Sequence, residues 1–206
     1  MKKLCLSAAL AAIVVLLIGS FSTQANNNSY PRVVRAPTAA SNDDATTFRA
    51  HLRGINETPG PVATQATGSF TAALSSDGSS LSYSVSYTNL NAQVLFSHIH
   101  FGLRKEGGGI MVFLCGPAAG NPNGGPPAGF PDPPACPGTT SGTVSGTVTA
   151  ANVVGPDSQG ITPGADFARV VQAMREGAAY VNVHSTRSKG GEIRGPVVVH
   201  HEDDDE

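Results

Sequence analysis

The sequence predicts an all-β domain, an antiparallel β-sandwich with one short amphipathic helix. Residues 81–88 alternate strictly between apolar and small polar side chains, a period of two that is typical of a half-buried strand. Turn residues separate further short runs of this kind, in a chain with 24 Gly and 15 Pro. Only residues 163–177 carry apolar side chains at helical spacing. Many short strands with one helix indicate two packed layers of sheet.

The two ends of the chain are expected to lie outside this domain. Residues 1–25 have a basic start, an apolar core and a small-residue cleavage site, the pattern of a secretory signal peptide. We expect a flexible linker over 26–46, the folded domain over 47–199 and an acidic disordered tail over 200–206. The protein is therefore expected to be exported (secreted, periplasmic or at the cell surface), with no membrane span after signal cleavage.

The charge pattern argues against one class of partner. The chain carries 13 Lys and Arg against 15 Asp and Glu, and five of these acids are the last five residues. No basic cluster is interleaved with aromatic side chains, so we expect no nucleic-acid partner.

Eight segments are predicted as strands or strand-like runs from alternation and from the turns between them. On the first, 47–54, His51 lies among arginines on the solvated face. The segment 141–149 is rich in small residues and is predicted as a pair of strands or one bulged strand. The other segments are 66–74, 81–88, 94–101, 110–114, 178–184 and 191–198.

Residues 163–177 are predicted as the helix. Thr162 is placed to cap it and Pro163 suits the first helical position. Gly177 suits the C-terminal stop. The apolar stripe, which we assign to core packing, consists of Phe167, Val170, Val171 and Met174.

Cys115 and Cys136 remain as a natural pair once the signal peptide is removed, and export favours a disulfide between them. The 20 residues between them include seven Pro and five Gly, too many breakers for regular structure. Closing a loop of this size should stabilise the fold by about 3 kcal/mol. A cysteine metal site is disfavoured, because no CxxC spacing is present.

His98 and His100 lie two residues apart on a predicted strand and therefore on one face of it. Apolar residues occupy both faces of this strand, so neither face is expected to be freely solvated. Buried imidazoles are costly unless they have partners. The function of the chain is therefore expected to depend largely on the partners of these two imidazoles.

The last two strands are expected to form a hairpin centred on Ser188. In that register His184 opposes Glu192, and Asn182 opposes Arg194, with all four side chains on one face. A slip of one residue would move them to the other face. The hairpin therefore offers a polar cluster that can meet the two histidines of the earlier strand.

Two interpretations of this cluster remain open. In the first, His98, His100 and His184 bind one Zn or Cu ion, and Glu192 orients an imidazole from behind. In the second, the same residues form a satisfied polar network beneath a loop and only hold the hairpin to the sheet. Glu57, in an early turn, can join either arrangement.

No residue is assigned a catalytic role. The chain has no Gly-x-Ser-x-Gly elbow, which would mark a serine nucleophile. It also has no glycine-rich loop between a strand and a helix that would hold a phosphate.

A set of motifs runs through the predicted domain. They are Phe48-x-Ala50-x-Leu52-x-Gly54-x-x-Glu57-x-Pro59, Leu81-x-Tyr83-x-Val85, Ser97-His98-Ile99-His100-Phe101-Gly102, Gly146-Thr147-Val148-Thr149-Ala150, Ala179-Tyr180-Val181-Asn182-Val183-His184-Ser185 and Gly190-Gly191-Glu192-Ile193-Arg194-Gly195. Together, over residues 47–198, they resemble the CHRD domain. That family is named from chordin, a secreted antagonist of bone morphogenetic proteins, and also occurs as single-domain exported microbial proteins.

The resemblance implies a secreted, all-β, sandwich-like domain. It does not imply growth-factor binding, which in chordin is attributed mainly to cysteine-rich modules that this chain lacks. The strand with His98 and His100 is also similar to the metal strand of copper/zinc superoxide dismutases. A Greek-key, immunoglobulin-like or superoxide-dismutase-like sandwich is therefore expected. A histidine-rich zinc loop and a bridging histidine are missing from the sequence, which argues against dismutase activity.

The sequence thus favours a non-enzymatic binding or structural module that acts outside the cell or at its surface. Its partner would be an unidentified protein or a ligand of the cell envelope. The alternative is a Cu or Zn domain built on the histidine strand and a third histidine, with possible redox activity.

Overall fold

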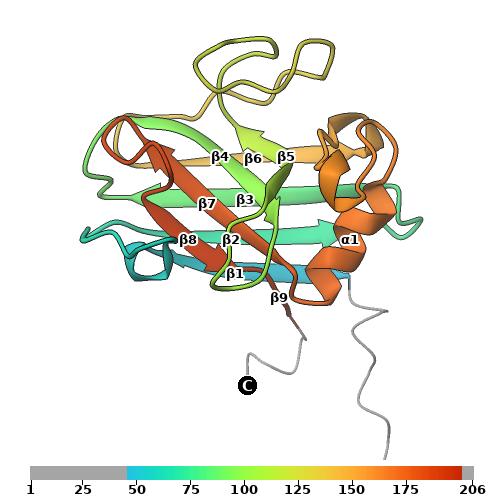
Figure 1. The fold of residues 1–206 in the computed structure, drawn as a ribbon, viewed down its shortest axis with the longest axis horizontal. Helices are drawn as coiled ribbons and strands as arrows, with labels where there is room; N and C mark the ends of the chain where they lie inside the picture. The colour runs from blue at the N-terminus through green and yellow to red at the C-terminus, as the bar shows by residue number, and fades with distance from the viewer. Residues whose placement is uncertain (1–45, 201–206) are drawn as a thin grey trace, which may run out of the picture. The chain divides into compact units, whose positions relative to one another are not determined.

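The computed structural model describes residues 46–200, all of which belong to one compact unit. The predicted signal peptide, nearly all of the predicted linker and nearly all of the acidic tail lie outside the described residues. Nine strands and one α-helix make up the described fold (Figure 1). They are β1 (Thr47–Arg53), β2 (Thr67–Leu74), β3 (Ser80–Thr88), β4 (Val94–Phe101), β5 (Gly109–Cys115), β6 (Gly142–Thr149), α1 (Phe167–Arg175), β7 (Ala179–Ser185), β8 (Ile193–Pro196) and β9 (Val198–Val199).

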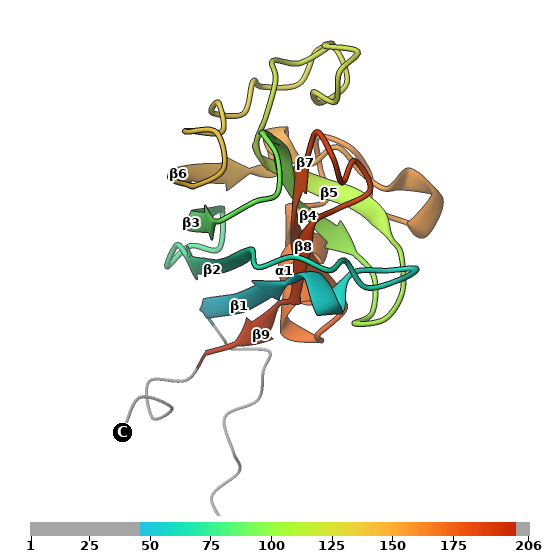
Figure 2. The ribbon, with the colours of Figure 1, turned by 90° about the vertical axis from the view of Figure 1, so that its left-hand side faces the viewer.

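The strands form one antiparallel sheet in the order β5-β4-β7-β8-β1-β2-β3-β6, with β9 paired to β1. The sheet folds over so that β1, β2, β3 and β6 face β4, β5, β7 and β8 across the core (Figure 2). A single bridge between Val112 and Val153 brings β5 close to the end of β6 and nearly closes the sheet. The prediction of an all-β antiparallel fold with one helix is therefore confirmed.

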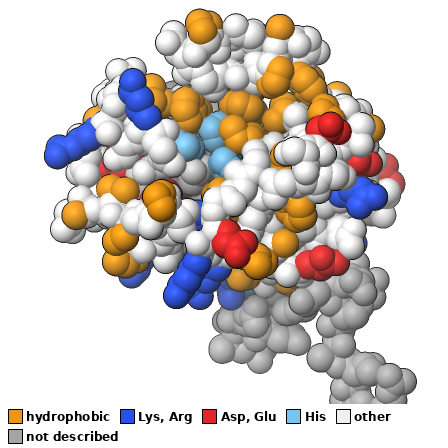
Figure 3. Space-filling view, viewed as in Figure 1, with side chains coloured by type: hydrophobic (Ala, Val, Ile, Leu, Met, Phe, Trp, Pro, Cys, Tyr) orange, Lys and Arg blue, Asp and Glu red, His pale blue; other side chains and the backbone are white. Residues whose placement is uncertain are grey.

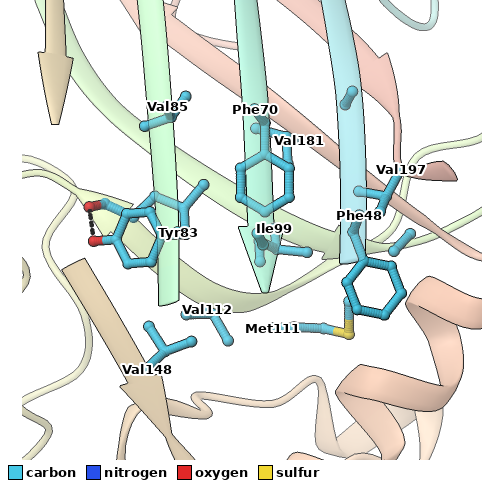
Figure 4. Packing of buried hydrophobic residues seen from close by; sticks show 14 of the residues in the cluster. Phe48, Phe70, Tyr83, Val85, Ile99, Met111, Val112, Val148, Val181 and Val197 are labelled. Atoms are coloured by element: carbon cyan, nitrogen blue, oxygen red, sulfur yellow. Dashed lines mark hydrogen bonds between the residues drawn. The ribbon is translucent and has the colours of Figure 1, made fainter. Parts of the chain in front are cut away.

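The core lies between the two layers, where the inward residues of each strand meet. Phe70 and Val85 are register partners on β2 and β3, and both are buried (Figure 4). Tyr83 reaches across the core and donates its hydroxyl to the carbonyl oxygen of Leu114 at 2.6 Å. The predicted apolar stripe of α1 is buried against this core. These contacts make a continuous apolar interior.

The helix begins later than predicted, at Phe167 and not at Pro163. Gly164 has a φ of +71°, which a right-handed helix does not allow. Thr162 therefore does not cap the helix; its backbone N–H instead donates to the carboxylate of Asp166 at 2.7 Å. The predicted end is close to the observed one, since the helix ends at Arg175 and Gly177 follows with a φ of +70°.

The small-residue segment 141–149 forms strand structure, as predicted, but neither a pair of strands nor a bulged strand. It contains one regular strand, β6, which pairs with β3 without a register shift. The small side chains have a packing reason. A Cβ on Gly146 would lie 2.6 Å from the hydroxyl of Tyr83, so glycine makes room for the tyrosine that crosses the core.

The predicted disulfide between Cys115 and Cys136 is present. It ties the end of β5 to the loop of residues 116–135, which covers part of β4. In this loop, Gly124 lies against the ring of Phe96, and a Cβ at that glycine would lie 2.2 Å from the ring. The disulfide thus holds a loop without regular structure over β4.

We expect the double substitution Cys115→Ala/Cys136→Ala to lower the free energy of unfolding by about 3 kcal/mol, because the unfolded chain loses a constraint. Urea denaturation followed by circular dichroism measures this change. The unsubstituted protein in a reducing agent is the matched control and should show a similar loss. Equal stability of all three samples would contradict a stabilising role of the disulfide.

A candidate metal centre of three buried histidines

Strands β4 and β7 lie side by side and bring three histidines together. In their ladder Phe96 pairs with His184, and His98 pairs with Asn182. His98 and His100 lie two residues apart on β4 and therefore on one face of it, the face on which His184 lies. The ring centroids of His98 and His184 are 5.0 Å apart, and those of His98 and His100 are 5.3 Å apart.

The three imidazoles offer one ligand atom each, and these atoms lie within 4.8 Å of one another. The side chains are 2%, 8% and 6% exposed for His98, His100 and His184. Histidine surface gathers at the centre of one face of the molecule, in a hollow surrounded by apolar side chains (Figure 3). The cluster is therefore buried, but it lies directly beneath the surface.

Two of the imidazoles are held by backbone carbonyl groups. Nδ1 of His100 lies 2.9 Å from the carbonyl oxygen of Gly108, and Nδ1 of His184 lies 2.9 Å from that of Lys189. A carbonyl oxygen only accepts, so both Nδ1 atoms carry the proton and both Nε2 atoms keep a lone pair. Metal-bound histidines are usually oriented in this way, with the second ring nitrogen bonded to a carbonyl or carboxylate.

The remaining ring nitrogens have no hydrogen-bond partner among the described residues. They are Nε2 of His100, Nε2 of His184 and both nitrogens of His98. A buried polar atom without a partner costs about 1–3 kcal/mol. A satisfied polar network would supply hydrogen bonds at these atoms, and the Asn182 side chain, which interacts with His100 and raises its pKa, leaves its own Oδ1 without a partner. The arrangement instead leaves three donors free to face one ion.

Burial keeps the histidines neutral. It lowers the pKa of His184 to about 4 and that of His98 well below its usual value, and the neighbouring imidazoles lower the His98 pKa further. Burial also lowers the pKa of His100, against the opposing effect of its hydrogen bond to Gly108. A metal ion binds the neutral imidazole, so the cluster needs no deprotonation at neutral pH.

Aromatic side chains surround the cluster. The Phe96 ring lies 4.9 Å from that of His98 and 4.5 Å from that of His184, and the Phe113 ring meets the His98 ring edge-on at 4.4 Å. Tyr180 stacks on His100, with the ring planes 4° apart and the centroids at 4.6 Å. The histidines and the polar residues of the last hairpin were predicted at this site. Phe113, Tyr180 and the two backbone carbonyls were not, because their place at the site depends on which strands become neighbours.

The predicted pairing of Asn182 with Arg194 is present in the β7–β8 ladder. The Cζ atom of the Arg194 guanidinium lies 3.4 Å from the centroid of the Tyr180 ring, a cation–π contact. The guanidinium also donates to Thr58 Oγ1 and to the carbonyl oxygens of Leu103 and Glu106. Arg194 therefore fixes the aromatic support of His100 and the β4–β5 loop together.

Glu192 does not have the predicted role of orienting an imidazole. Its carboxylate accepts from Thr64 Oγ1 at 2.8 Å, from the Asn91 N–H at 2.6 Å and from the hydroxyl of Ser185. The β7–β8 ladder begins only at Ile193, after Gly191 with a φ of +128°. Strand alternation therefore does not extend to Glu192, which is the physical reason for the error.

Glu57 faces Arg194 and not the histidines. Burial raises the pKa of its carboxyl group to about 7, against the opposing effect of the Arg194 charge. A Cβ on Gly191 would lie 2.6 Å from Oε1 of Glu57, so the glycine leaves room for this carboxyl group.

The chain matches a family model, that of the CHRD domain, over residues 48–197. A search of curated proteins finds no match. Among residues 46–200, no helix is long and apolar enough to cross a membrane.

In metal-free protein, we expect the free energy of unfolding to fall as the pH drops from about 6.5 to 4.5. His98 and His184 have strongly lowered pKa values when folded, so in this range they take up protons only in the unfolded state, and His100 acts in the same direction. Glu57 acts in the opposite direction, because its folded pKa of about 7 lets the folded state take up one proton. The net slope should be at least about one proton, or about 1.4 kcal/mol per pH unit.

Urea denaturation at several pH values, with a chelator present, measures this slope. Glu57→Gln should raise it by about one proton, and His184→Gln should lower it by about one. A slope near zero in all three proteins would contradict the buried, neutral state of the histidines.

Proposed function

We propose that this chain, which belongs to the CHRD domain family, is an exported metal-binding domain that holds one copper or zinc ion. The proposal is carried by one observation: three neutral, buried imidazoles converge with ring nitrogens that have no other partner. His98, His100 and His184 would be the ligands. Gly108 and Lys189 would orient two of them through their carbonyl oxygens.

The distances support a shared ion. Zn–N bonds are about 2.0–2.1 Å long, so two nitrogens on one ion lie about 3.3–3.6 Å apart in tetrahedral or trigonal geometry. The ligand atoms here are within 4.8 Å of one another. Small rotations of the three side chains would close this difference.

The disulfide supports the proposal that the protein is exported to an oxidising compartment. Disulfides form and persist in oxidising compartments such as the periplasm and the extracellular space. The bond between Cys115 and Cys136 fits such a compartment, as does the signal peptide expected from the sequence. An exported protein also meets metal ions outside the reducing cytosol.

The geometry supports metal binding, which the sequence left as the alternative to a binding or structural module. A purely structural cluster would be more stable with its imidazole nitrogens hydrogen-bonded, and here they are left unpaired at a cost. We therefore place metal binding first. A partner protein or envelope ligand can still bind elsewhere on the domain.

We expect the purified protein to hold one equivalent of copper or zinc after chelation, reconstitution and desalting. Elemental mass spectrometry measures the content. His98→Gln and His184→Gln should each lose the stoichiometric ion. His51→Gln is the matched control, because His51 is exposed on β1, and it should keep the ion.

The variant pair His200→Gln/His201→Gln, made in each protein, removes any contribution of the two histidines near the end of the chain. Added metal should also raise the free energy of unfolding by about 2.7 kcal/mol at a concentration 100 times the Kd. Absence of stoichiometric metal in the unsubstituted protein would refute the proposal.

A further inference from the structure

His98 differs from the other two histidines of the site in how its ring is held. His100 and His184 each have a backbone carbonyl oxygen at Nδ1. His98 has no hydrogen-bond partner at either ring nitrogen within the described part of the chain. Its ring packs against those of Phe96 and Phe113. Aromatic contacts do not decide which nitrogen carries the proton, whereas a hydrogen bond at one nitrogen does.

One ion does not satisfy His98 by itself. A neutral imidazole that gives one nitrogen to a metal carries a proton on the other nitrogen. That N–H group needs an acceptor when it is buried. Nδ1 and Nε2 of His98 are both buried, so the acceptor has to come from a neighbouring group of the protein.

Asn182 offers such an acceptor. It is the register partner of His98 in the β4–β7 ladder, and its Oδ1 is buried without a hydrogen-bond partner. Register partners place their side chains on the same face of a sheet, with Cβ atoms about 4.5–5.5 Å apart. The amide oxygen of Asn182 and the Nδ1 atom of His98 each lie two bonds beyond Cβ, so these two atoms can meet across the ladder.

The fold fixes the position of Asn182 beside the imidazoles. Its backbone carbonyl oxygen accepts from Ser97 Oγ at 2.7 Å, and its side chain is only 3% exposed. The same side chain interacts with His100, which places the amide group among the ligand rings.

Arg194 is the neighbour of Asn182 on the other side, since the two are register partners in the β7–β8 ladder. Its Nε–H group is also buried without a hydrogen-bond partner. The Glu57 carboxyl group interacts with the Arg194 charge and has an unpartnered oxygen of its own, Oε1. A hydrogen bond between opposite charges is stronger than one to a neutral amide, so Arg194 is expected to pair with Glu57. This pairing leaves the Asn182 oxygen to His98.

One ion and one hydrogen bond then account for the unpartnered atoms of the cluster. These atoms are both ring nitrogens of His98, Nε2 of His100, Nε2 of His184 and Oδ1 of Asn182. An ion would take Nε2 of each histidine, and Nδ1–H of His98 would donate to Asn182. As a fourth ligand, in contrast, Asn182 would leave the His98 N–H group without an acceptor.

We infer that Asn182 orients His98 for the metal by accepting a hydrogen bond from its Nδ1–H group. The inference rests on the metal site proposed above and deepens it by naming the third orienting group. All three imidazoles then share one arrangement, with an oxygen at Nδ1 and Nε2 facing the ion. Asn182 is a positioning residue, because it acts on the ion through His98.

Metal affinity tests this role. Zn(II), and Cu(I) without oxygen, are titrated into the full mature protein against chromogenic chelators. Asn182→Leu keeps the size of the side chain but removes the acceptor, and it should raise the Kd by about 10–100-fold. Asn182→Asp is the matched control, because it keeps an acceptor oxygen in place, and it should bind at least as tightly as the unsubstituted protein.

The outcomes separate the two proposals. No stoichiometric binding of copper or zinc by the unsubstituted protein would refute the proposed function and this inference with it. Stoichiometric binding with the same Kd in Asn182→Leu would overturn the inference and leave the metal site standing.

Nuclear magnetic resonance of the unsubstituted zinc or Cu(I) protein gives a readout that does not depend on the folding of a variant. Proton–nitrogen correlation spectra of isotope-labelled imidazoles show which ring nitrogen carries the proton. His98 should have a protonated Nδ1 that exchanges slowly with solvent and a metal-bound Nε2. In Asn182→Asp the Nδ1 proton should move downfield, because a carboxylate is a stronger acceptor than an amide. A metal-bound Nδ1 in His98, or a metal-bound oxygen of Asn182, would overturn the inference.

Discussion

The antiparallel pairing of β4 with β7 is the constraint on which the site depends. It places His184 next to Phe96 and leaves the two β4 histidines on the same side. The opposite faces of both strands are fixed in the core, where Ile99, Val181 and Val183 are fully buried. A slip of one residue would expose these apolar side chains, so the hydrophobic core itself holds the register that brings the imidazoles together.

Two buried charged residues, Arg194 on β8 and Glu192 just before it, bind the loops around the site through hydrogen bonds. Arg194 donates hydrogen bonds to Thr58 and to the β4–β5 loop. Glu192 accepts hydrogen bonds from Thr64, Asn91 and Ser185. Each charged group is matched by several hydrogen bonds, which is the condition under which a buried charge is tolerated. The last hairpin therefore does more than close the sheet, because its side chains position the loops that carry Gly108 and cover the histidines.

The histidine cluster contrasts with these two groups in its hydrogen bonding. Arg194 and Glu192 each have multiple partners, whereas the imidazole nitrogens that face one another have none. Places where a fold departs from complete hydrogen bonding are typical of functional sites, where an absent ligand completes the arrangement. The large apolar core offsets this local cost.

The sequence alone determined the all-β class and the β7–β8 register, because period-two alternation and turn residues are local signals. It also paired the two cysteines that form the disulfide and put the three histidines in one group. It failed at Pro163, where Gly164 with its positive φ delays the helix, and at Glu192, where Gly191 interrupts the alternation. Only the tertiary structure decided which nitrogens are free, since the carbonyls of Gly108 and Lys189 come from loops whose paths depend on long-range packing. It also decided the aromatic enclosure: Phe113 and Tyr180 reach the histidines only because β5 and β7 flank β4, and strand order is a property of the whole chain.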